Sequence, residues 1–338
     1  MSLIDHLNNV RSVFFPSDVQ QNVEQASFSE MSKDELLSVM RSDWENMKDS
    51  QKEQLMQEIA NVVAGERGIP STPSVHVIHT SPNIYGSYGN GVININMDNI
   101  DNRNPYEIMD TLAHEINHAY QDYSKTMGTA SGYSEEELTL MKAQGARGVY
   151  VSEGPMYNQQ SNELDSNNIG LKFVTENNRM DAADKNLCEY IGRRQVYFER
   201  VCNDYRNHPE MCKNFEISQV QRALSMHVIT PDEQQKAVDM IANNQNPIRQ
   251  ETENNYLMVQ TISGQLEEAN RMQSEGMIGS MTQSDDISFR NESVSQILSV
   301  PAEATADSTS SYGSDSFASS GNTSRQDNDA STSSGMGM

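Results

Sequence analysis

Two histidines separated by three residues are the most distinctive chemical feature of the sequence. His114 and His118 flank Glu115 in an HExxH pattern. Residues four apart lie on the same face of a helix, so both imidazoles could bind a single Zn²⁺ ion. Glu115 would then project beside the metal, where a carboxylate can accept a proton from water. Chance placement of these residue types gives about 0.01 such motifs in the chain. The pattern therefore predicts a hydrolytic zinc site with His114 and His118 as metal ligands and Glu115 as the catalytic base.

The segment around this motif has the pattern of an α-helix. Asn104 is a favoured helix cap, and Pro105 suits the first helical position. Apolar residues then recur at helical spacing at Met109, Leu112, Ala113, Ile116, Ala119 and Tyr120. His114 and His118 lie at the border of this apolar face, so we expect them to face a cleft.

A zinc site of this kind needs a third protein ligand. The metzincin pattern HExxHxxGxxH does not supply it, because Gln121 and Ser124 stand where glycine and histidine are required. Further along the chain, residues 161–174 have the pattern of a second helix, which carries Glu163 and Asp165 near its start. Either carboxylate could complete the site.

Several segments between about 85 and 174 resemble the bacterial gluzincins. The matching segments are Tyr85 to Tyr88, Val92-Ile-Asn-Ile-Asn96, Leu112-Ala-His-Glu-Ile-Asn-His-Ala-Tyr-Gln121 and Asn162-Glu163-Leu-Asp165-Ser-Asn167. The resemblance is closest to the small soluble zincin domains of phage, mobile-element and effector proteins. It implies that Glu163 is the third metal ligand, with Asp165 as the competing ligand. Asn167 stands where many gluzincins have an aspartate that orients a ligand histidine.

The same resemblance implies roles for a strand and for a tyrosine. Zincins line the cleft with an edge strand that pairs with an extended substrate, and residues 91–96 are the expected strand. A tyrosine or histidine usually stabilises the oxyanion in this chemistry. Tyr133, Tyr150 and Tyr157 lie in the relevant stretch, and their spacing does not choose between them.

The expected fold is α+β and mostly helical, a zincin-like domain with a small antiparallel sheet and an HExxH helix. Residues 75–79 and 91–96 have strand patterns, and the turn-rich stretch 85–91 between them suggests a hairpin. Capping patterns predict helices that begin after Ser32, Ser50, Ser134 and Thr230.

The chain of 338 residues divides into three parts by composition. We expect an N-terminal segment over 1–30, the zincin-like domain over 31–275 and a disordered tail rich in Ser, Gly and Asp over 276–338. The formal net charge is -24, of which the tail, with 8 acidic and 2 basic residues, contributes -6. The net charge argues against nucleic-acid binding. The remaining -18 indicates either a solvated acidic surface or a preference for a basic polypeptide substrate. We expect no membrane insertion, because no apolar run approaches the ~18 residues that a membrane helix needs.

These features predict a zinc-dependent metallopeptidase that hydrolyses peptide bonds of an intracellular protein. The N-terminus has no secretory signal pattern, so we expect a cytoplasmic protein, or an effector or toxin exported into a target cell without a cleaved signal peptide. The alternative is a non-catalytic zinc-binding regulatory protein on a zincin scaffold. A zinc hydrolase of non-peptide substrates is a third possibility.

Arginines and cysteines outside the motif carry weaker signals. Arg193, Arg194, Arg200 and Arg206 lie among many acidic residues, so we expect surface ion pairs. Cys188, Cys202 and Cys212 form no CxxC pattern, and we expect buried free thiols.

Overall fold

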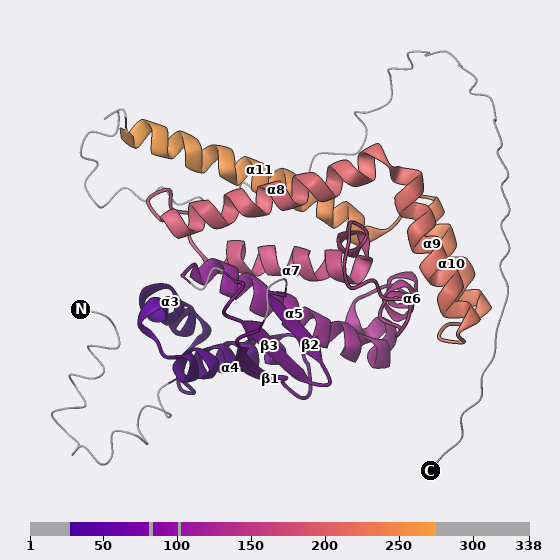
Figure 1. Ribbon diagram of the computed structural model, residues 1–338, viewed down its shortest axis with the longest axis horizontal. Coiled ribbons are helices and arrows are strands. Elements are labelled where there is room, and N and C mark those ends of the chain that lie inside the picture. The colour runs from indigo at the N-terminus through magenta and orange to yellow at the C-terminus, as the bar shows by residue number, and fades with distance from the viewer. Residues whose placement is uncertain (1–27, 81–83, 101–102, 275–338) are drawn as a thin grey trace, which may run out of the picture. The chain divides into compact units, whose positions relative to one another are not determined.

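The computed structural model describes residues 28–80, 84–100 and 103–274. This part of the chain is mostly helical with one small sheet, so the α+β class is confirmed (Figure 1). The predicted tail over 276–338 and all but the last three residues of the predicted segment 1–30 lie outside the described residues.

The helices and strands have the following bounds. The α-helices are α3 (Lys33–Asp43), α4 (Asp49–Glu66), α5 (Pro105–Met127), α6 (Glu135–Gln144), α7 (Ser161–Asn177), α8 (Lys185–Asn207), α9 (Pro209–Ser225), α10 (Pro231–Ala242) and α11 (Pro247–Ser274). Short 3₁₀ helices are η1 (Trp44–Asn46), η2 (Gly128–Ser131) and η3 (Tyr157–Gln159). The strands are β1 (Ser74–Ile78), β2 (Gly86–Gly89) and β3 (Val92–Asn96).

Side-chain caps account for most of the helix starts. Ser32, Ser134 and Thr230 each accept a hydrogen bond from the backbone three residues later, which confirms the predicted starts of α3, α6 and α10. The prediction for Ser50 was wrong, because α4 begins at Asp49. There the side chain of Gln51 accepts a hydrogen bond from the backbone of Lys48 at 3.0 Å, so the cap lies two residues earlier.

The sheet has the order β1-β3-β2 and is mixed. β1 and β3 are parallel, whereas β2 and β3 form an antiparallel hairpin. Asn90 and Gly91 both have positive φ, at 53° and 76°, as a tight two-residue hairpin turn requires. The predicted antiparallel pairing of 75–79 with 91–96 was therefore wrong, because the stretch assigned to the turn contains a strand of its own. The region 91–96 is also the central strand and not an edge.

Helix α5 connects the sheet to the rest of the fold. It packs against β2 and β3 on one side and against α7 on the other, and α8 and α11 lie side by side beyond α7 (Figure 1). Ile108, Leu112 and Ile116 of α5 are fully or almost fully buried, as are Ile93 and Ile95 of β3. This apolar contact holds the HExxH helix in place, since burial of such side chains is the main stabilising contribution to a fold.

A second apolar cluster joins α6, α9 and α10. It contains Leu140, Val220, Ala237 and Ile241, all almost fully buried. The three cysteines form no disulfide; Cys202 and Cys212 are buried as predicted, whereas Cys188 is partly exposed. No helix in the described ranges is both long enough and apolar enough to cross a membrane.

Candidate metal centre

Two packed helices supply the residues of the candidate centre. His114 and His118 lie on α5, and Glu163 lies in the first turn of α7. The two helices approach closely because α7 has a glycine at the contact. A Cβ atom at Gly170 would lie 1.8 Å from Oδ1 of Asp110, so any larger residue would force the helices apart.

The nitrogen and oxygen atoms of these three residues converge. Nε2 of His114 and Nε2 of His118 are 3.1 Å apart. Oε2 of Glu163 lies 3.5 Å from the first nitrogen, and Oε1 lies 3.6 Å from the second. Ligands of a tetrahedral zinc ion with bonds of about 2.0–2.1 Å are about 3.3–3.4 Å apart. The spacing and the donor chemistry therefore fit Zn²⁺, and no other such group of three occurs in the part of the chain that the structure describes.

The charges of the three converging residues shift one another's pKa values. Burial acts to lower the pKa of His118, but the neighbouring Glu163 carboxylate outweighs it and raises that pKa to about 9. Burial acts to raise the pKa of Glu163, but His118 and His114 hold it well below its ordinary value. Burial raises the pKa of Glu115, against the opposing effect of the two histidines.

Two tyrosine hydroxyls donate to the carboxylate of Glu163. Tyr150 donates to Oε1 at 3.0 Å, and Tyr157 donates to Oε2 at 2.6 Å. Two of the three tyrosines suggested for the oxyanion thus lie beside the triad. The third, Tyr133, donates instead to Oδ2 of Asp165 at 2.7 Å.

Asp165 lies outside the converging group. Its Oδ2 accepts hydrogen bonds from Nδ2 of Asn117 at 2.7 Å and from Nε2 of Gln121 at 2.8 Å, in addition to the one from Tyr133. The structure therefore brings Glu163, and not Asp165, to the two histidines. The sequence predicted neither the donors that surround Asp165 nor the contact between Gln121 and Asp165.

The edge strand β2 lies against the proposed base. A Cβ atom at Gly86 would lie 2.8 Å from Oε1 of Glu115 and 2.8 Å from Cγ2 of Thr111. Glu115 is 5 % exposed. The strand beside Glu115 is therefore β2 rather than the expected 91–96. Gly86 is the residue that the sequence interpretation missed, although it is one of several glycines in 85–91.

Arg194 differs from the surface arginine that we expected. Its side chain is 11 % exposed, and Nη1 lies 3.3 Å from Oδ2 of the buried Asp110. Nη2 donates to the backbone oxygen of Asn167 at 3.0 Å and to its Oδ1 at 3.1 Å. Asn167 in turn donates to the backbone oxygen of Glu163 at 2.8 Å. Arg194 on α8 thus contacts both helices of the centre, α5 and α7.

Arg193 and Arg206 form the exposed ion pairs that were expected.

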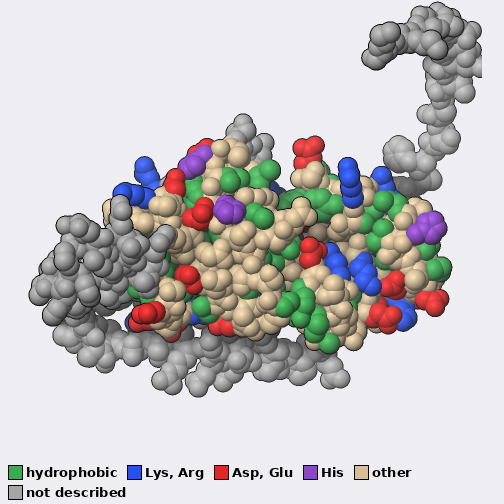
Figure 2. Space-filling model, turned by 90° about the horizontal axis from the view of Figure 1, so that it is seen from below, with side chains coloured by type: hydrophobic (Ala, Val, Ile, Leu, Met, Phe, Trp, Pro, Cys, Tyr) green, Lys and Arg blue, Asp and Glu red, His purple; other side chains and the backbone are tan. Residues whose placement is uncertain are grey.

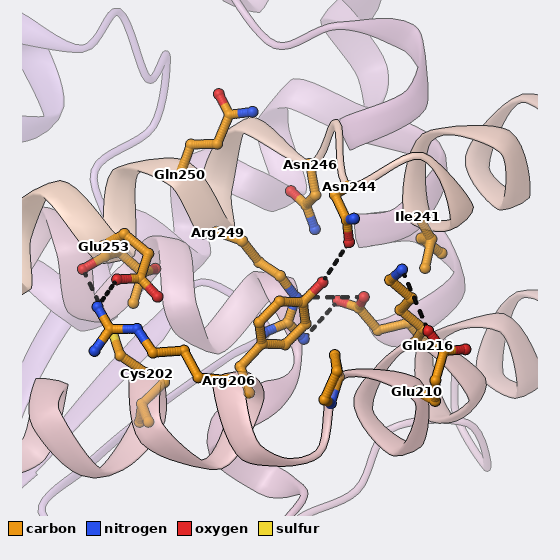
Figure 3. A pocket seen from close by; sticks show the side chains of 15 residues that line it. Cys202, Arg206, Glu210, Glu216, Ile241, Asn244, Asn246, Arg249, Gln250 and Glu253 are labelled. Carbon is orange, nitrogen blue, oxygen red and sulfur yellow. Dashed lines mark hydrogen bonds and ion pairs between the residues drawn. The ribbon is translucent and has the colours of Figure 1, made fainter. Parts of the chain in front are cut away.

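A separate cavity of about 510 Å³ lies between α8, α9, α10 and α11. Arg249 and Glu216 point toward each other within it, and their ion pair of 3.0 Å is largely buried (Figure 3). None of the three converging residues lines this cavity.

Comparison with known proteins adds no assignment. The chain matches no protein-family model, no curated protein and no solved structure. The gluzincin resemblance stays a prediction.

Proposed function

We propose that the protein is a zinc-dependent metallopeptidase in which His114, His118 and Glu163 hold the metal. The observation that carries this proposal is the convergence of the three side chains, with N–N and N–O distances of 3.1, 3.5 and 3.6 Å. Three protein ligands of the types His, His and Glu are the set used by catalytic zinc sites that keep a fourth position open.

Bound zinc would supply Lewis acidity, which makes water a better nucleophile and polarises a carbonyl group. Glu115 accepts a proton from the attacking water and later passes it to the leaving amine. Its buried position on the same helix as the two histidines supports this role. A protein that only binds zinc needs no base at this position.

The strand β2 is the proposed docking edge for the substrate. Within the described residues, β2 pairs with β3 on one side, and its other edge is not paired in the sheet. An extended peptide can add to such an edge through main-chain hydrogen bonds. Gly86 of the same strand adjoins Glu115, so a peptide bound there would pass the base.

Tyr150 and Tyr157 are the proposed oxyanion donors. Both hydroxyls lie within hydrogen-bond distance of Glu163, so they are close to the carbonyl of any substrate that binds at the triad. A donor that points at the developing negative charge stabilises the transition state of acyl transfer.

A basic polypeptide is the substrate class that the net charge favours. On the face shown in Figure 2, however, acidic and basic side chains of the described residues are interspersed. The preference is therefore best tested directly, by comparing cleavage of basic and acidic peptides of equal length. Faster cleavage of the acidic peptides would contradict it.

The function is tested by Glu115→Gln against the wild type. We expect both proteins to bind an equimolar amount of zinc, and the variant to lose at least about 100-fold in cleavage of a proteome-derived peptide library. Glu107→Gln on the same helix is the control, because Glu107 pairs with Arg193 away from the triad. If the wild type binds zinc but cuts no peptide, the peptidase assignment fails. A survey of non-peptide substrates would then separate the other two functions.

A further inference from the structure

The side-chain amide of Gln121 has a fixed orientation. Gln121 is 3 % exposed and lies three residues after His118 on α5. Its Nε2 is 2.9 Å from the backbone oxygen of Asn162 and 2.8 Å from Oδ2 of Asp165. Both of these oxygens can only accept, so the NH₂ end of the amide must face them.

This orientation turns the amide oxygen toward His118. Oε1 of Gln121 lies 3.0 Å from Nδ1 of His118. An amide oxygen can only accept, so Nδ1 must carry a hydrogen. In the neutral imidazole the lone pair is then on Nε2, which is the nitrogen that faces His114 and Glu163.

We propose that Gln121 is a positioning residue that selects the zinc-binding tautomer of His118, and that Asp165, together with the backbone oxygen of Asn162, holds Gln121 in the required orientation. The inference rests on the proposed metal site and assigns a role to two residues that the proposed function does not use. It also explains why Asp165 is buried beside the centre without joining the converging group.

The carboxylate of Asp165 can only accept hydrogen bonds. Oδ2 of Asp165 accepts from Asn117, Gln121 and Tyr133, and a carboxylate oxygen offers no alternative donor. An asparagine there could turn its NH₂ group to Gln121, which would leave the backbone oxygen of Asn162 as the main acceptor that holds the NH₂ group of Gln121 in place. Wherever Gln121 then presents its NH₂ group to His118, Nδ1 has to accept, the hydrogen lies on Nε2, and the metal-binding lone pair is lost.

The test is the zinc affinity of purified full-length variants, measured by competition with a chromophoric chelator. We expect Asp165→Asn and Gln121→Leu each to weaken zinc binding by about 10–100-fold, the range found when the partner of a metal-bound histidine is removed. Asn255→Leu is the matched control, because it also removes a buried side-chain amide. The amide of Asn255 donates to Asn168 on α7 and not to the residues around His118. That control should bind zinc as the wild type does.

The decisive measurement is the NMR signal of the ring nitrogens of His118, because it reports which nitrogen carries the hydrogen. In the zinc-free wild type, at a pH where the imidazole is neutral, we expect the hydrogen on Nδ1. In the Asp165→Asn and Gln121→Leu variants we expect a larger fraction with the hydrogen on Nε2. Circular dichroism and the melting temperature of each variant show that it is folded.

Three results would contradict these proposals, and they distinguish a failure of the Gln121 and Asp165 roles from a failure of the metal site itself. Wild-type zinc affinity in a folded Asp165→Asn variant would overturn the role of Asp165 and Gln121 while leaving the metal site intact. A folded Gln121→Leu variant in which neutral His118 still carries its hydrogen on Nδ1 to the same extent as the wild type would also overturn it. If the wild type itself does not bind zinc, the proposed function fails.

Discussion

Gly86 on β2 and Glu115 on α5 are so close that an added methyl group would fit only if the side chain of Glu115 moved. The Cβ of an alanine at position 86 would lie 2.8 Å from Oε1 of Glu115. The close contact sets the position of the proposed base relative to the edge where a substrate would bind.

Gly86→Ala should therefore displace Glu115 and lower kcat while zinc binding is retained. We also expect a loss of about 1–3 kcal/mol in the free energy of unfolding, because the methyl overpacks the contact. Gly89→Ala is the control on the same strand, where a Cβ would meet nothing within 4 Å. Equal kcat values for the two variants would show that the Gly86 contact does not position the base.

The hydroxyls of Tyr150 and Tyr157 should both contribute to catalysis. Tyr150→Phe and Tyr157→Phe each remove one donor to Glu163. Loss of an oxyanion donor typically lowers kcat by about 10²–10³-fold, so each variant should show a loss of this kind at similar KM. Tyr205→Phe is the control, because that hydroxyl donates to Asn244 just after α10, and both residues line the separate cavity. If neither variant lowers kcat, both tyrosines only support Glu163.

The buried ion pair of Asp110 and Arg194 should contribute to the free energy of unfolding. Arg194→Met leaves the Asp110 carboxylate buried without its ion-pair partner, and such changes cost about 3–5 kcal/mol. Adding Asp110→Asn should recover part of the loss. Arg193→Met, at a side chain that is 41 % exposed, should cost no more than about 1 kcal/mol. Urea unfolding measures all three, and similar losses for Arg194→Met and Arg193→Met would contradict the assignment.

His79 provides a pH-dependent contact away from the proposed centre. Its Nδ1 lies 2.7 Å from Oδ1 of Asp98, and its Nε2 lies 3.0 Å from Oδ2 of Asp49. Asp98 and, to a smaller extent, Asp49 raise the pKa of His79 above its ordinary value. The contact therefore stabilises the fold at pH values below the unfolded pKa of about 6.5, and this stabilisation is lost as the pH rises through the higher folded pKa.

NMR titration of the His79 ring checks this contact. Asp98→Asn should lower the pKa of His79 more than Asp49→Asn does. An unshifted pKa in the wild type would show that the contact does not form in solution.

The local features of the site were the most predictable. The Asn104 cap and Pro105 mark the start of α5, and the apolar spacing correctly predicts that His114 and His118 share one helix face. The second helix begins at Ser161, as its pattern indicated. These predictions succeed because caps and helical periodicity depend on neighbours within a few residues.

Features that depend on contacts between residues far apart in the chain could not be predicted from the sequence. The parallel pairing of β1 with β3 and the edge position of β2 are set by how the sheet packs on α4 and α5. Arg194 is buried because Asp110 and Asn167, on two other helices, meet it. Asp165 competed with Glu163 as the candidate for the third ligand, because only the packed structure shows the three donors that surround it.

An anomalous-difference map at the zinc absorption edge, from crystals of the zinc-loaded protein, tests the central claim most directly. The account predicts a single strong peak within about 2.0–2.2 Å of Nε2 of His114, Nε2 of His118 and a carboxylate oxygen of Glu163. The absence of a peak at these three residues, or a peak with Asp165 in place of Glu163, would contradict it.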